Sequence, residues 1–170
     1  PRVNPITSHS RLWLEWNLIP NSQWAPRSID PDADLDKSLY ILKFQPVFPF
    51  QLNQNWTLLT RTIFRFVSAP TASPNISFTP AGTPFIQGWN QRNAMGLSDI
   101  SPTFFLVPNL GPDWTIGVGP SLVIPAEDVP TNSGKLSLGP ALLGYFHRGP
   151  WTIGGRMRNV WSVAGDPSRK

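Results

Sequence analysis

The residues of this chain that are best suited to bind a solute are polar and charged. They occur at alternate positions in extended segments. Because side chains alternate between the two sides of a strand, residues two apart lie on one face of a sheet. A wall of cations inside a pore attracts anionic solutes and lets them pass. An arginine–aspartate network that rigidifies an interior, for example Arg65 with Asp99, explains the same residues equally well. The set opposite the apolar positions comprises Lys43, Gln45, Arg61, Arg65, Asp99, Arg156 and Arg158.

Acidic residues at alternate positions in the segment 20–37 form a second candidate site. Clusters of carboxylate oxygens suit divalent cations. The spacing lacks the glycine at the sixth position and the glutamate at the twelfth that define an EF-hand calcium loop. We therefore favour a solvated loop and predict no metal site. The acidic residues are Asp30, Asp32, Asp34 and Asp36.

Other kinds of catalytic or binding chemistry find little support. The chain contains no cysteine, which excludes disulfides, thiolate nucleophiles and cysteine-based zinc sites. It has no hydrolase elbow and no phosphate-binding loop, and its basic residues are dispersed instead of forming the stripe typical of nucleic-acid-binding proteins. We predict a protein that is not an enzyme, has no cofactor and binds no nucleic acid.

Strands must position the polar residues, because the hydrophobic pattern has a period of two. The composition, with 20 Pro and 13 Gly among 170 residues, disfavours long helices. Most of the periodic segments exceed the ordinary strand length of ~5–6 residues and match the ~9–11 residues that cross a bilayer. Seven segments show this pattern: 11–19, 38–52, 56–67, 97–108, 114–125, 136–146 and 151–163.

The connections between these segments alternate in length. Short turns rich in Asn, Gly and Pro lie at 53–55, 109–113 and 147–150, and long connections lie at 20–37, 68–95 and 126–135. In an up-and-down meander, alternate connections lie at the same end of the sheet. Short turns at one end and long loops at the other are typical of outer-membrane barrels.

Aromatic residues flank the short turns. Such placement predicts an aromatic girdle at the membrane interface. Aromatic plugs at the end of a β-sandwich are the alternative explanation. The predicted girdle consists of Phe48, Phe50, Trp56, Trp114, Phe146 and Trp151.

Several blocks of sequence resemble a bacterial outer-membrane family that is described as "transporter" or as the meta-pathway of phenol degradation family. The blocks include FQPVFPF at 44–50, NWTLLTRT at 55–62, GLSDISP at 96–102 and GPW at 149–151. The resemblance implies a transport protein of the Gram-negative outer membrane, in contact with lipid and lipopolysaccharide. Members of the family are longer, with an N-terminal signal and further C-terminal strands, so the resemblance implies an incomplete barrel here.

We therefore predict an all-β protein in which 1–170 form one domain, an antiparallel up-and-down meander that is part of an outer-membrane β-barrel. The predicted function is porin-like, passive transport of small solutes, with aromatic or anionic solutes favoured. The alternative is a soluble β-sandwich or lipocalin-like binding module, with the apolar face inward and the arginine face outward. Alternation of apolar and polar residues fits both.

Overall fold

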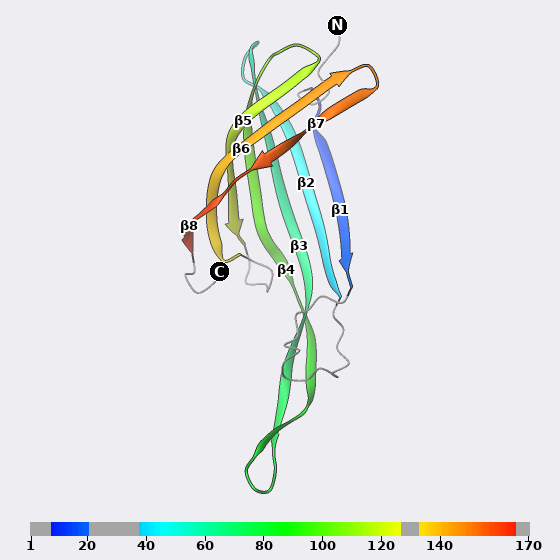
Figure 1. Ribbon diagram of the computed structural model, residues 1–170, viewed down its shortest axis with the longest axis vertical. Coiled ribbons are helices and arrows are strands. Elements are labelled where there is room, and N and C mark those ends of the chain that lie inside the picture. The colour runs from blue at the N-terminus through cyan, green and yellow to red at the C-terminus, as the bar shows by residue number, and fades with distance from the viewer. Residues whose placement is uncertain (1–7, 21–37, 127–132, 166–170) are drawn as a thin grey trace.

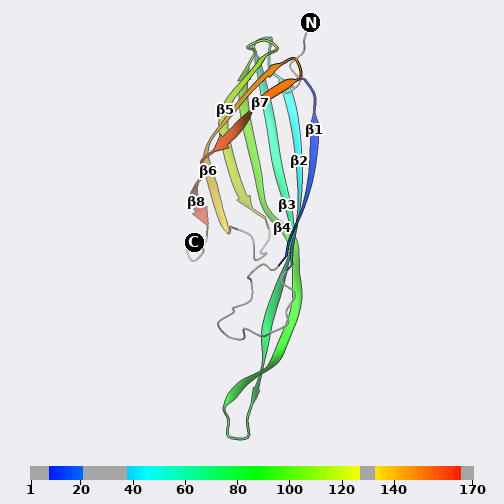
Figure 2. The same ribbon diagram turned by 45° about the vertical axis from the view of Figure 1, so that its right-hand side comes forward.

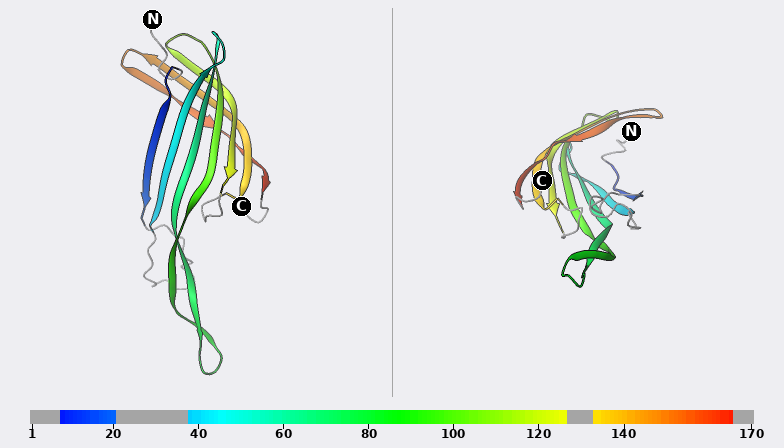
Figure 3. Two further views of the ribbon diagram at one scale, coloured as in Figure 1. Left: turned by 180° about the vertical axis from the view of Figure 1, so that it is seen from behind. Right: turned by 60° about the horizontal axis from the view of Figure 1, so that its bottom comes forward.

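The computed structural model describes residues 8–20, 38–126 and 133–165, and all regular secondary structure in them is β. The antiparallel strands follow one another as an up-and-down meander that curls into a half-barrel (Figures 1 and 3). This confirms the predicted all-β meander. The strands are β1 Arg11–Ile19, β2 Leu39–Gln51, β3 Trp56–Phe78, β4 Pro84–Pro108, β5 Trp114–Pro125, β6 Lys135–Arg148, β7 Trp151–Arg158 and β8 Trp161–Gly165.

The segment expected as one strand at 151–163 is two strands, β7 and β8, that both pair with β6. At the break, the backbone N–H of Asn159 donates to the carbonyl of Pro140 at 3.0 Å. The carbonyl of Asn159 lies where a side chain on Gly139 would stand, so only glycine fits there. A two-residue irregularity along one edge of β6 therefore accounts for the eighth strand.

The prediction of a long loop at 68–95 is wrong, because β3 and β4 extend through this segment. They stay paired from Ser68 with Met95 to Phe78 with Pro84, and this hairpin projects well beyond the rest of the sheet (Figures 1 and 2). The prolines and small polar residues of this segment are typical of a loop, and the sequence therefore predicted one. Each strand of a two-stranded hairpin has a free edge, however, and proline is tolerated on an edge because no ladder bond is lost.

The three short turns lie together at the end of the sheet opposite the hairpin tip (Figure 1). Hydrogen bonds join neighbouring turns: Asn109 N–H donates to the carbonyl of Asn55 at 2.8 Å, and His147 N–H donates to that of Asp113 at 2.7 Å. The three short turns thus share one end of the sheet, as an up-and-down meander requires. The segments 21–37 and 127–132 lie outside the described residues.

The two faces of the sheet differ in character. On the concave inner face, Leu59 of β3, Phe105 of β4 and Leu143 of β6 belong to one buried cluster. Since β3 and β6 are not hydrogen-bonded neighbours, only the inside of the curl brings their side chains together. The convex outer face instead carries large exposed apolar side chains, such as Leu42 and Val118.

Candidate functional site

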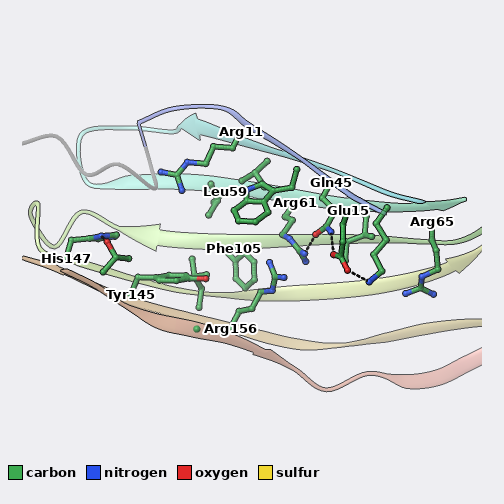
Figure 4. Close-up of a pocket in the computed structure, with 17 residues that line it drawn as sticks. Arg11, Glu15, Gln45, Leu59, Arg61, Arg65, Phe105, Tyr145, His147 and Arg156 are labelled. Carbon is green, nitrogen blue, oxygen red and sulfur yellow. Dashed lines mark hydrogen bonds and ion pairs between the residues drawn. The ribbon is translucent and has the colours of Figure 1, made fainter. Parts of the chain in front are cut away.

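A cavity of about 800 Å³ occupies the inner face and is lined by residues of β1, β2, β3, β4, β6 and β7 (Figure 4). Its lining joins apolar side chains to polar and charged ones, and His147 and Thr152 add polar groups beside the short turn at 149–150. Five of the seven polar residues predicted from the sequence line it, namely Lys43, Gln45, Arg61, Arg65 and Arg156.

Strand register brings these side chains to the same face. Lys43 is directly opposite Arg65 in the β2–β3 pair, and Arg156 is opposite Leu143 in the β6–β7 pair. Residues directly opposite in an antiparallel pair point to the same side of the sheet. Arg158, opposite Ala141, therefore also belongs to the inner face.

Glu15 of β1 is the centre of a hydrogen-bonded network that the site prediction missed. Its carboxylate accepts from Lys43 Nζ at 2.8 Å and from Gln45 Nε2 at 3.3 Å, and Gln45 Oε1 accepts from the guanidinium of Arg61. Asn17 Nδ2 donates to the same carboxylate at 3.0 Å. The β1–β2 register places Glu15 directly opposite Lys43, a contact that the sequence of one strand does not show.

Asp99 and Arg65 form an ion pair, with 3.8 Å between Oδ2 and Nη1. The Asp99 side chain is buried and also accepts hydrogen bonds from the N–H of Ser133, at 3.1 Å, and from its hydroxyl, at 3.0 Å. The β3–β4 register shifts at this point, where Phe64 pairs with Ile100 but Phe66 pairs with Leu97. At this bulge, two residues of β4, Ser98 and Asp99, lie opposite Arg65. A bulge changes the direction in which the side chains beside it point.

Arg61, Arg156 and Arg158 form a group of like charges inside the curl. Arg61 lies within electrostatic range of both other guanidinium groups. In the described part of the chain, none of the three forms an ion pair with a carboxylate, whereas Lys43 and Arg65 each do. This part of the cavity therefore concentrates positive charge beside apolar walls.

The residues predicted as an aromatic girdle lie on the outer face near the short turns. Two pairs are in ring contact: Trp114 with Phe146, at 4.8 Å between ring centroids, and Phe48 with Phe50, at 6.5 Å. Trp56 and Trp151 are exposed. Their role at a membrane interface stays a prediction.

The acidic run at Asp30, Asp32, Asp34 and Asp36 lies outside the described residues. Within the described ranges, no group of three or more His, Asp or Glu side chains is arranged to hold a metal ion. The same ranges contain no helix that is long and apolar enough to span a membrane.

Comparisons with protein-family models, with curated proteins and with solved structures found no match to this chain. The resemblance to outer-membrane transporters therefore depends on the sequence blocks alone.

Proposed function

We propose that this chain is part of a bacterial outer-membrane β-barrel whose interior gives small solutes passive passage. The observation that carries the proposal is the inverted distribution of side chains, with the large exposed apolar residues outside the curl and the charged residues inside it. A lipid-facing sheet needs this arrangement, since acyl chains offer no hydrogen bonds and no solvation of charge.

The outer face is apolar across the whole width of the sheet. Exposed apolar surfaces larger than a few hundred Å² mark interaction or membrane sites in proteins. Here the surface runs over strands at both edges, so that a small docking partner would leave much of it uncovered. Among its members, each at least 37% exposed, are Leu14, Leu42, Phe66, Phe104, Leu106, Ile116, Val118, Leu138, Leu142, Ile153 and Met157.

The direction of the curl separates the proposal from the soluble alternative. A lipocalin-like module would line its concave face with the apolar set and point its arginines to solvent. In this chain Arg61, Arg65 and Arg156 line the concave cavity, while Leu42 and Val118 lie on the other face. The arrangement thus supports a membrane protein over a soluble binding module.

Passive passage requires only a suitable diameter, polar walls and an electric field. Among the described residues, the cations of the inner face outnumber the carboxylates Glu15 and Asp99, so their combined field is positive. Such a field favours anions, and its reach is about 8 Å at ~0.15 M salt. Solutes that pass close to Arg61 and Arg156 would experience it most.

Conductance measurements on the full-length protein in planar bilayers test this function. We expect a pore that prefers anions, and charge reversal by Arg61→Glu with Arg156→Glu should move the reversal potential toward cation preference. Arg92→Glu, a change at an exposed position on the hairpin, is the matched control and should leave selectivity unchanged. A folded protein that stays soluble without detergent and carries no current would overturn the proposal.

A further inference from the structure

The cavity has two adjoining zones of different chemistry. Leu59 and Arg61 are two residues apart on β3 and both line the cavity, and Leu143 is directly opposite Arg156 in the β6–β7 pair. Each of these arginines therefore has a member of the apolar cluster beside it. Figure 4 shows Arg61 and Arg156 extending into one space, with Phe105 and Tyr145 toward the short turns.

The charges of the inner face are only partly matched within the described residues. Glu15 is paired with Lys43, and Asp99 is paired with Arg65. No described carboxylate pairs with Arg61 or Arg156, and these two guanidinium groups repel each other across the cavity. An anion between them would remove this repulsion, and the planar fork of arginine binds carboxylates with two parallel hydrogen bonds.

The size of the cavity fits a small organic molecule. Its volume of about 800 Å³ lies within the ~300–1,000 Å³ typical of small-molecule sites. An inorganic anion would leave the apolar zone without a complement, and a cation would be repelled. A ligand with an anionic head and an apolar body matches both zones.

We propose that this cavity is a specific, saturable binding site for small organic carboxylates with an apolar body. The carboxylate binds between Arg61 and Arg156, and the body packs against Leu59, Phe105, Leu143 and Tyr145. This inference rests on the proposed function, because the site would lie on the path of the solute. Such a site would select solutes by direct contact with side chains, in addition to the selection by the electric field of the inner face.

A matched series of ligands tests the site in planar bilayers with the full-length protein. Hexanoate has both parts, acetate lacks the body, and hexanamide lacks the charge. We expect hexanoate to inhibit the chloride current saturably, and acetate and hexanamide to act at least about tenfold more weakly. Arg156→Gln should weaken inhibition by hexanoate about tenfold or more, since it removes a charged donor.

Control variants separate binding from folding. Arg156 is exposed to the cavity, so its replacement should not disturb the sheet, and unchanged heat-modifiable gel mobility would show this. Arg156→Lys should restore part of the inhibition, and Arg92→Gln should leave it unchanged. Arg61→Gln provides a second variant on the opposite wall.

The outcomes distinguish the site from the pore. If the protein conducts but hexanoate acts no better than acetate, or if Arg156→Gln has no effect, the site is wrong and the pore stands. If the protein does not conduct, the pore is wrong, and calorimetry with hexanoate then tests the site by itself. Heat of binding that is lost in Arg156→Gln would support the site, and absence of binding would overturn it.

Discussion

At the scale of single residues, the inner-face charges fall into two kinds. Lys43 and Arg65 each have a carboxylate partner in the described structure, whereas Arg61 and Arg156 lie beside apolar side chains without one. The sequence left open whether the arginines are selective or structural. We propose that both roles occur in different residues: Arg65 holds the sheet through its ion pair with Asp99, and Arg61 and Arg156 meet the solute.

Asp99 tests the structural role. Asp99→Asn should lower the free energy of unfolding by ~1–3 kcal/mol, because it leaves Arg65 without a carboxylate and weakens a buried acceptor of two hydrogen bonds. Denaturant titration of the full-length protein in lipid vesicles measures this change. Glu15→Gln is the matched comparison and should cost less, since the Glu15 side chain is 45% exposed and its ion pair is screened by solvent. Equal losses would argue against a structural pair at Asp99.

From residue types and alternation we named five of the polar residues that line the cavity, Lys43, Gln45, Arg61, Arg65 and Arg156. Residue type and alternation did not reveal Glu15, because a single acid in a short N-terminal segment carries no pattern of its own. Its role became visible only through the β1–β2 register, which places it opposite Lys43. Contacts across strands depend on register, and turn residues in the sequence fix register only where strands are joined by short turns.

At the scale of elements, four strands, β1, β2, β5 and β6, begin and end within two residues of the positions that the period of two predicts. The hairpin of β3 and β4 was missed because its prolines, serines and asparagines resemble a loop. Its stability comes from pairing across the hairpin, including the mutual amide hydrogen bonds of Asn75 and Asn90. Such pairing is invisible to a pattern read along one strand.

Removing the hairpin tip should leave the sheet intact. Among the strands of the described structure, residues 69–95 pair only with one another, because β2 pairs with β3 as far as Ser68 and the β4–β5 register starts at Asp99. Replacing residues 73–90 with Asn-Gly should therefore preserve heat-modifiable mobility and conductance. A deletion extended to remove Arg65 and Asp99 should abolish both. Loss of folding in the shorter deletion would show that the hairpin supports the sheet.

An arginine on the outer face of β5 tests whether that face meets lipid. Val118 is 52% exposed, and Val118→Arg should destabilise the protein by ~2–4 kcal/mol if its surroundings are acyl chains. Unfolding titrations in vesicles of full-length Val118→Arg and Ile63→Arg compare the two faces. Ile63 lines the cavity, so arginine there should cost less. Equal penalties would indicate a sheet that is covered on both faces.

Inner-face positions of β5 are unsuitable as that control. Gly119 has the carbonyl of Phe104 where its side chain would stand, and Ser121 is fully buried with its hydroxyl 2.8 Å from that of Thr103. A large residue would overpack either position. The small residues of β5 thus serve close packing of strands rather than an open interior.

At the scale of the whole molecule, the direction of the curl is the feature on which our proposal of a membrane protein over a soluble module depends. Alternation along a strand gives two faces but does not say which becomes concave. The answer requires side chains from distant strands to meet, as Leu59 and Leu143 do. For this reason the sequence predicted the meander, while the assignment of inside and outside needed the three-dimensional structure.

The most direct test is the environment of neighbouring residues on opposite faces. The chain has no cysteine, so single cysteines at Leu42 and Lys43 can carry spin labels on the full-length protein in lipid vesicles. Leu42 is on the outer face and Lys43 lines the cavity. If the outer face meets lipid, the label at Leu42 collides with dissolved oxygen and the label at Lys43 collides with a water-soluble nickel chelate. The reverse pattern, or access of the chelate to both labels, would contradict a membrane-embedded barrel.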